Sequence, residues 1–495
     1  MAFVRGTIAF ILFTSVLQAG DVTLHDTWSL AKLQGQSVGY EHSQVIAHSS
    51  KSEIRYIFTI DRVLKVKRAG MELLVHSTSR TLESADGTVV DFEKNEEEGG
   101  SPLVTRGYRE GEQLVVLERG NEQHYPMPKE ALGPRAAQNK INSIVLHPGS
   151  TLEFLAFEED FPQAPVKIKE EVITKQSHST IHGDQDLWKI KVTMDSMPGI
   201  ELTEWVDDSG QTVISEFPFA GSGNLELSIC SKEEAMKPIS GGEISSTNII
   251  VPDKILNDYR KLHEAQYHIS GSEKLTVVSG AEQTVTTLAD NSLWVTVQVP
   301  TYSEDAITWF IPATVTPELQ PYLMASSFMQ IEDPSVQDLA KKAVGSETNP
   351  LRVARKIESF VRDYITTKDL SVGFASAADT VKSRTGDCTE HAVLAAALGR
   401  AVGLPTRVVM GLGYLPPSSN DSSVNSKGTF GFHMWAEAYL GTNQWVAMDS
   451  ALGGFDVGHI AFVKTDLGTS ADRDAAFLPI MQMVGKLKIE VVEMK

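Results

Sequence analysis

The first half of the chain consists of short runs of alternating apolar and polar residues, separated by tight-turn sequences. Between about residues 23 and 230, β-branched residues are enriched in runs such as 54–66. Turn sequences separate such runs at Asp86-Gly87, at Glu110-Gly111 and across residues 207–210. This combination is typical of hairpins in antiparallel sheet. It predicts a β-meander or β-sandwich with one wetter sheet face.

The pattern changes twice after residue 230. Residues 231–250 contain many Ser, Gly and Glu residues, as a linker does. A second β-rich stretch follows, and the pattern leaves open whether it forms its own region or extends the first domain. Past about Pro321, helix-start signals take over. Asp333-Pro334 and Asn349-Pro350 each pair a capping residue with a proline at the first helical position.

We expect a third helix from Asp387 to Gly403, followed by strands and, at Leu415 to Thr429, a surface loop. Helices followed by antiparallel strands predict an α+β fold for this part. At 495 residues the chain is too long for a single core. The predicted parts are a signal peptide (1–19), a β-rich domain (20–235), a second β-rich region or an extension of the first (250–320), and an α+β domain (321–495).

The N-terminus resembles a secretory signal. Arg5 is a positive flank, Ile8 to Leu17 is an apolar stretch, and Ala19 supplies a small residue for cleavage. An uncleaved anchor is the alternative, but the apolar run is well short of the ~20 residues that a spanning helix needs. We therefore expect an exported protein, periplasmic or extracellular, without a membrane span after signal removal.

Charge and cysteine content exclude several classes of protein. The formal net charge of −20 argues against nucleic-acid binding, because a polyanion would be repelled. Only Cys230 and Cys388 are present, so the chain is not a disulfide scaffold, although one bridge between them is an open alternative. The 13 histidines are scattered and no cluster has zinc-site spacing. We expect neither a metal nor a cofactor.

Cys388 occupies a position that favours a thiolate. Asp387 and Glu390 have the spacing of a capping box, which makes Cys388 the first residue of a helix. Unpaired N–H groups and the helix dipole favour an anion there. Gly386 is expected to allow close approach to the sulfur. The apolar residues that follow predict a buried helix that holds the sulfur rigidly.

A thiolate nucleophile needs a base and a group that orients the base. Residues 432–439 alternate as a strand that carries His433, and Trp445 to Asp449 returns antiparallel after a turn. A hairpin of this length brings Asp449 close to His433. An aspartate in this place sets the histidine tautomer and stabilises the imidazolium. We predict Cys388 as nucleophile, His433 as base and Asp449 as orienter.

Three sequence blocks, in order, resemble the transglutaminase-like superfamily. They are Arg384-Thr385-Gly386-Asp387-Cys388-Thr389-Glu390-His391-Ala392 with the helix up to Val408, His433-Met434-Trp435-Ala436-Glu437, and Trp445-Val446-Ala447-Met448-Asp449. The resemblance covers roughly residue 321 to the C-terminus. It implies a papain-like thiol enzyme domain, in an exported bacterial-type member, with Cys388, His433 and Asp449 in the nucleophile, base and orienter positions.

The chain departs from cross-linking transglutaminases in two respects. Those enzymes place an oxyanion-stabilising tryptophan upstream of the nucleophile, and no tryptophan lies between Trp309 and Cys388. No calcium-binding loop is recognisable either. One oxyanion donor is expected to be the Cys388 backbone N–H, and a second is not identified. Both departures favour hydrolysis over amine transfer.

The predicted function is an exported cysteine hydrolase, protease or acyltransferase that acts on amide bonds of a peptide or protein. The alternative is a non-catalytic binding or assembly protein that keeps the domain as a scaffold. The remaining candidates are expected to have structural rather than catalytic roles. These are helix packing for His391, a helix cap for Glu390, an ion pair for Arg407, core positions for Trp435 and Trp445, a position at a strand edge for His459, and a small buried apolar side chain for Cys230.

Overall fold

The computed structural model describes residues 20–495 except 51–52, 69–70, 220–222, 245–248, 272–274, 276, 308, 313–314, 371–372, 418–425, 442–443 and 484. The predicted signal peptide, residues 1–19, lies outside the described residues, as does most of the loop expected before the histidine strand. The chain forms two compact units with a boundary between Glu243 and Ile244.

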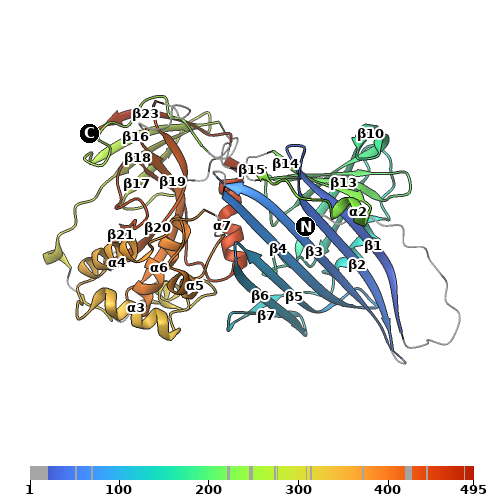
Figure 1. Ribbon diagram of the computed structural model, residues 1–495, viewed down its shortest axis with the longest axis horizontal. Helices are drawn as coiled ribbons and strands as arrows, with labels where there is room; N and C mark the ends of the chain where they lie inside the picture. The colour runs from blue at the N-terminus through green and yellow to red at the C-terminus, as the bar shows by residue number, and fades with distance from the viewer. Residues whose placement is uncertain are drawn as a thin grey trace. The chain divides into compact units, whose positions relative to one another are not determined.

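The first unit is built on one large sheet, and its described strands follow one another as hairpins (Figure 1). Strands β1 to β8 form one meander and β9 to β14 a second, and the two are joined where β1 pairs antiparallel with β14. The elements are β1 (Gly20–Leu33), β2 (Gln36–Ser49), β3 (Ile54–Arg68), β4 (Met71–Ser84), β5 (Val89–Glu98), β6 (Ser101–Glu110), β7 (Gln113–Glu118), β8 (Asn121–Pro126), α1 (Pro134–Ile141), β9 (Thr151–Ala156), β10 (Val166–Thr180), β11 (Gly183–Met194), β12 (Glu201–Val206), β13 (Thr212–Pro218), β14 (Asn224–Cys230), α2 (Lys232–Ala235) and β15 (Gly242–Glu243).

The hairpins expected from turn residues are present. Asp86-Gly87 joins β4 to β5, Glu110-Gly111 joins β6 to β7, and residues 207–210 join β12 to β13. Gly87 and Gly111 have positive φ angles of 92° and 64°, a backbone conformation that glycine adopts without steric cost. The turn chemistry therefore sets where these strands end.

The second unit contains helices that cluster around α6 (Figure 1). Asp333 and Asn349 cap α3 and α4 with their side chains, and each helix begins at the proline that follows. α6 is rich in alanine and buried over most of its length, which suits a central helix. The helices are the 3₁₀ helices η2 (Glu304–Ala306) and η3 (Pro317–Leu323), and α3 (Pro334–Val344), α4 (Pro350–Tyr364), α5 (Ala377–Ser383), α6 (Cys388–Ala401) and α7 (Ser470–Met483).

Two four-stranded sheets complete the second unit. One has the order β21-β20-β19-β22, and the other β17-β18-β16-β23. The stretch 250–320, which the sequence left unassigned, supplies β16 to β18, and β16 pairs with the C-terminal strand β23. The strands are β16 (Glu264–Ser270), β17 (Gln283–Thr287), β18 (Leu293–Gln298), β19 (Thr406–Leu415), β20 (Thr429–Gly441), β21 (Gln444–Met448), β22 (His459–Thr465) and β23 (Lys488–Met494).

The whole is an α+β protein in which a β-rich N-terminal unit precedes a unit of helices and antiparallel strands. Among the described residues, no helix has both the length and the apolar character needed to cross a membrane.

Candidate active site

Cys388 is the first residue of α6, and the start of that helix is fixed by a reciprocal capping box. The Asp387 backbone N–H donates to Glu390 Oε2 at 2.8 Å, and Asp387 Oδ1 accepts the Thr389 N–H at 2.9 Å. Glu390 Oε1 also accepts the Ala375 N–H at 2.9 Å. Cys388 itself is half-buried. Its thiol therefore lies at the positive end of a well-anchored helix, where a thiolate is stabilised.

Gly386, which was expected to allow close approach to the sulfur, lies against the side chain of Glu390. A Cβ atom at this position would come within 2.3 Å of Glu390 Cβ and 2.5 Å of Glu390 Cγ. The glycine therefore makes room for the buried Glu390 side chain. Burial raises the pKa of Glu390, and Asp387 adds to the effect.

His433 lies in β20, and Asp449 directly follows β21. β20 and β21 pair antiparallel, with Ala436 opposite Met448. The hairpin brings His433 Nε2 to 2.9 Å from Asp449 Oδ2. Gly413 leaves space beside the histidine, because a Cβ there would lie 3.0 Å from both Cβ and Cγ of His433. The Trp435 ring stacks at 6.0 Å and 24° to the imidazole.

Both carboxylate oxygens of Asp449 are held. Oδ1 accepts the backbone N–H groups of Ala451 at 2.9 Å and Leu452 at 3.1 Å. The backbone N–H of Asp449 donates to Glu358 Oε1 at 2.9 Å. Burial opposes ionisation, but His433 and His459 outweigh it and hold the pKa of Asp449 well below its usual range. Asp449 is therefore an ionised carboxylate with 1% exposure.

A second histidine shares Asp449. His459 Nε2 lies 2.9 Å from the same Oδ2, and its Nδ1 lies 3.1 Å from Asp456 Oδ1. Burial lowers the pKa of His459, but hydrogen bonds to Asp449 and Asp456 outweigh burial and raise it to about 9. His459 does lie at the start of an edge strand, as expected, but its contact with the site was not foreseen.

Helix α6, which begins at Cys388, and strand β20, which carries His433, are neighbours. α6 packs against β20, and it also packs against α4, the helix that carries Glu358. Cys388, His433 and Asp449 thus come from the start of a central helix, the strand that it covers and the residue after the next strand. The catalytic roles of the three residues, and a hydrogen bond between the Cys388 sulfur and His433, remain predictions.

His433, Asp449 and His459 also have nitrogen and oxygen atoms within 4.8 Å of one another. Each N···O distance of 2.9 Å is that of a charge-assisted hydrogen bond. His459 uses its other nitrogen on Asp456 and carries a proton on each nitrogen when it is charged. Protons therefore account for this cluster without an ion.

The other candidates have structural surroundings. Arg407 pairs with the buried Glu437 at 2.6 Å and lies 3.9 Å above the Trp445 ring. Trp309, the nearest tryptophan upstream of Cys388, donates Nε1–H to the Leu440 carbonyl at 2.6 Å. Cys230, which was expected to be buried, is half-buried at the end of β14, and neither it nor Cys388 forms a disulfide. A bridge between the two cysteines is absent.

His391 is buried on α6, and its Nδ1 lies 2.6 Å from the Asp387 carbonyl oxygen. This carbonyl accepts the Nδ1 proton, which anchors the ring to the first turn of the helix. Burial lowers the pKa of His391, so the ring is neutral at neutral pH. Among the described residues its Nε2 has no hydrogen-bond partner.

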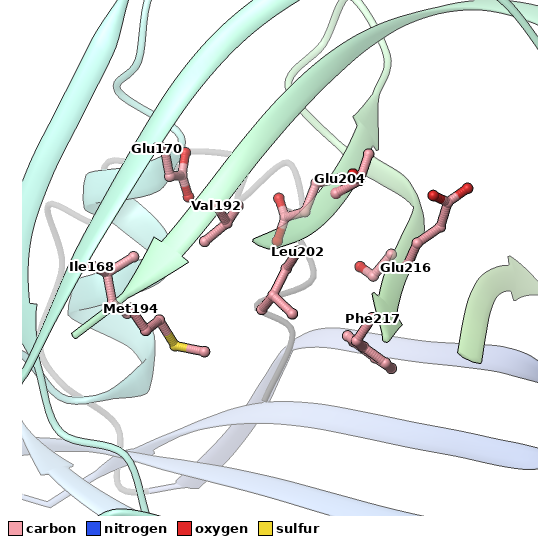
Figure 2. A pocket seen from close by; sticks show the side chains of 10 residues that line it. Ile168, Glu170, Val192, Met194, Leu202, Glu204, Glu216 and Phe217 are labelled. Atoms are coloured by element: carbon pink, nitrogen blue, oxygen red, sulfur yellow. The ribbon is translucent and has the colours of Figure 1, made fainter. Parts of the chain in front are cut away.

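The first unit contains a hollow between β10, β11, β12 and β13 (Figure 2). Ile168, Met194, Leu202 and Phe217 line it with the buried carboxylates of Glu170 and Glu204. Its cavity volume of about 10 Å³ is the smallest space that holds a single water molecule. It is too small to be a substrate site.

Residues 337–450 match the family model described as "Transglutaminase-like superfamily". This part of the chain is a transglutaminase-like domain. The match contains Cys388, His433 and Asp449, together with α4 and α6. The three sequence blocks therefore identified the right superfamily for this part of the chain.

Individual proteins are similar to only part of this chain or have low sequence identity with it. A curated protein of Haemophilus influenzae, described only as uncharacterized, is 32% identical over 153 residues, which is 27% of this chain and 40% of the relative. The chain thus spans less than half of that relative. A proposed cysteine protease from Cytophaga hutchinsonii has 16% identity and a TM-score of 0.31, covering 48% of this chain and 89% of the other.

A β-barrel-like protein from Brucella abortus, a domain of unknown function, has 13% identity and a TM-score of 0.31, with 42% of this chain and 96% of the other covered. At these TM-scores the structural likenesses carry no weight for function.

Sequence reasoning missed three residues around the transglutaminase-like domain's aspartate: His459, Asp456 and Glu358. The spacing of Asp456 and His459, three positions apart just before a strand, was a weak signal for a local carboxylate–imidazole pair. Nothing in the sequence connects Glu358, which lies 91 positions before Asp449, to the site.

Proposed function

We propose that the chain is an exported thiol acyl-transfer enzyme that acts on amide bonds of a peptide or protein, with Cys388 as nucleophile, His433 as base and Asp449 as orienter. Hydrolysis is the favoured outcome. The observation that carries the proposal is the buried hydrogen bond of 2.9 Å between His433 Nε2 and Asp449 Oδ2, beside a helix whose first residue is Cys388.

The geometry supports different roles for the two ring nitrogens of His433. Asp449 accepts the Nε2 proton, so the free acceptor of a neutral His433 ring is Nδ1. Nδ1 takes the proton of the Cys388 thiol as Sγ attacks the carbonyl carbon of the amide. The C–N bond then breaks, the proton passes to the leaving amine, and a thioester remains on Cys388.

The second half of the reaction returns the enzyme to its starting state. A water molecule gives a proton to His433 and attacks the thioester carbon. The C–S bond breaks, a carboxylic acid is released, and the proton returns to the thiolate. If a primary amine replaces water, the same steps produce a new amide. Trp309 is bonded to the Leu440 carbonyl and does not supply an oxyanion donor of the kind found in cross-linking enzymes, which favours water as acceptor.

Turnover by matched cysteine variants tests the proposal. The wild type, Cys388→Ala and Cys230→Ala are incubated with a peptide library, and cleavage, ammonia release and incorporation of a fluorescent primary amine are measured in parallel. Turnover by the wild type and Cys230→Ala but not by Cys388→Ala is expected. Amine incorporation that exceeds cleavage and ammonia release would overturn the preference for hydrolysis. Turnover that survives in Cys388→Ala would overturn the assigned nucleophile and leave the domain as a scaffold.

A further inference from the structure

Asp449 is shared between His433 and a second buried pair that the proposed reaction does not use. Asp456, His459 and Asp449 form a continuous hydrogen-bonded row that ends at His433, with distances of 3.1 Å, 2.9 Å and 2.9 Å. The side chains of His459 and Asp456 are 1% and 7% exposed. The row therefore lies inside the second unit, and its two histidines meet at a single oxygen of Asp449.

His459 has the rigidity that a positioning group needs. It opens β22, which pairs with β19, the strand that carries Gly413 beside His433. Its two ring nitrogens are held by two carboxylates on different segments. Asp456 Oδ1 is itself fixed, because it accepts the Gly458 N–H at 2.8 Å. The direction in which His459 Nε2 points is thus set at both ends.

The charge of His459 makes it a permanent donor. At neutral pH the imidazolium has a proton on each nitrogen, because its pKa is raised to about 9 against the opposing effect of burial. A neutral imidazole could exchange its donor and acceptor nitrogens, and a charged one cannot. Asp449 Oδ2 therefore receives one proton from a fixed direction, and the remaining direction on that oxygen belongs to His433.

Stability alone is a poor reason for this arrangement. Removing charges from water is expensive, and well-packed apolar side chains of similar volume are often as stable as a buried ion pair. Phe455 and Trp435 already pack against the His459 ring, so an apolar residue would suit these surroundings. The ionic row fixes an orientation that apolar packing would leave unspecified.

We propose that His459, oriented by Asp456, is a positioning residue that fixes the Asp449 carboxylate and, through it, the ring of His433. The inference rests on the proposed function, because it assigns His433 as the base of Cys388. In this proposal His459 acts through Asp449 and does not contact the substrate.

Alkylation of Cys388 by iodoacetamide measures the effect without knowledge of the substrate. The informative pair is His459→Gln and His459→Asn. The amide nitrogen of glutamine replaces Nε2 and still reaches Asp449, whereas that of asparagine replaces Nδ1 and does not. Both variants put a neutral amide into the same buried place, and only glutamine restores a donor at the position of Nε2. We expect His459→Asn to slow alkylation about tenfold, the scale on which outer-shell partners act, and His459→Gln to stay near the wild-type rate.

A matched control removes a histidine that pairs with a different carboxylate. His268 lies on β16 and contacts Glu490 at 3.0 Å, away from Asp449. His268→Asn should alkylate at the wild-type rate. If His459→Asn does not fold by circular dichroism, Asp456→Ala is the second variant. It leaves the His459 ring in place and removes the carboxylate from Nδ1, which keeps only the main-chain carbonyl of residue 456 at 3.2 Å. It should slow alkylation in the same direction.

A double-variant cycle distinguishes an effect of His459 through Asp449 from a nonspecific disturbance of the fold. If His459 acts through Asp449, then His459→Asn should slow alkylation in the wild type and have no further effect in an Asp449→Ala background. Equal slowing in both backgrounds, or equal rates for the Gln and Asn variants, would overturn the inference. Failure of the proposed function has a different signature, in which His433→Ala alkylates Cys388 as fast as the wild type does.

Discussion

Two buried groups of charged side chains, one in each unit, are built in different ways. In the first unit, Glu41 on β2 pairs with Arg62 on β3 at 2.8 Å, and the two are direct register partners across the sheet. In the second unit, Asp449 follows β21, His459 begins β22, and Glu358 comes from α4. One arrangement is a consequence of strand pairing, whereas the other brings separate segments to a single carboxylate.

This is the difference expected between a structural ion pair and the functional site proposed around Asp449. The Glu41–Arg62 pair needs only that two neighbouring strands be in register. The Asp449 group needs a helix, a strand and two loops to be correctly placed at once, although its charges are not required for the sheet to form. Convergence from several segments is what a preorganised site requires. The predictions below compare the two units directly.

The largest difference between the units is expected in the rates at which iodoacetamide alkylates Cys230 and Cys388. Burial raises the pKa of Cys230 to about 11, with Glu234 adding to the effect. Since this is about four units above pH 7, only about one part in 10⁴ of Cys230 is thiolate there. Cys388 lies at a helix start, beside the strand that carries His433. Iodoacetamide near pH 6 to 7 should modify Cys388 at least about 100-fold faster, as thiolate fraction controls the rate.

Mass mapping of the labelled peptides without reductant measures this ratio, and His433→Ala should reduce it. Comparable labelling of the two cysteines in the folded protein would show that the helix start and the histidine do not activate the thiol.

Removal of the shared carboxylate should have the next largest effect. Asp449→Ala leaves two buried imidazoles without their common acceptor, and breaking a buried pair of this kind costs about 3–5 kcal/mol. Glu41→Ala leaves Arg62, whose side chain is 25% exposed and can reach water. Glu41→Ala should cost about 1.5–3 kcal/mol, the scale of a hydrogen bond to a charged group. Hydrogen exchange resolved by peptide assigns each loss to its unit. A larger loss for Glu41→Ala would reverse the comparison.

The first unit's hairpins and the second unit's nucleophile helix could be predicted because their signals are local. Asp86-Gly87 and Glu110-Gly111 mark real turns, and the Asp387–Glu390 capping box sets the start of α6 at Cys388. The His433 strand and the Asp449 strand were recognised because they are one hairpin apart. Each of these inferences depends on residues close together in the sequence.

The remaining features depend on contacts that span many residues. β16 pairs with β23 across more than 200 positions, so the sequence could not assign the 250–320 stretch to the second unit. Glu358 and His459 reach Asp449 only after β19 to β22 have assembled. Gly386 was interpreted from its neighbour in sequence, Cys388, whereas its close contact is with Glu390.

The pH dependence of stability should also differ between the units. The folded-state pKa of His459 is raised to about 9, from an ordinary value of 6.5. Its stabilisation is therefore fully present below pH 6.5 and is lost as pH rises through 9. At 1.36 kcal/mol per pKa unit the total is at most about 3 kcal/mol. In the first unit, burial lowers the pKa of Arg62, but Glu41 outweighs burial and raises it, so Arg62 stays charged throughout.

Hydrogen exchange between pH 6.5 and 9, corrected for intrinsic rates, measures this difference. Protection of the β21 and β22 peptides should fall further in the wild type than in His459→Gln, whose amide does not titrate. At the β2 and β3 peptides the two proteins should show the same pH dependence. A fall of equal size in the variant would assign the pH dependence to another group.

The smallest effect should come from one substitution made in each unit. Gly111 in the β6–β7 turn has φ +64°, and a Cβ atom there would meet no heavy atom within 4 Å. Gly431 in β20 is equally open, and its φ is not in the left-handed region. Gly111→Ala therefore introduces backbone strain alone, about 1 kcal/mol of destabilisation. Gly431→Ala restricts the unfolded chain without strain and should stabilise by about 0.5 kcal/mol.

Urea unfolding followed by peptide-resolved exchange should give shifts of opposite sign in the two units. A stabilising shift for Gly111→Ala would mean that the β6–β7 turn does not need the positive φ angle of Gly111. A destabilising shift for Gly431→Ala would mean that β20 does not tolerate a side chain there.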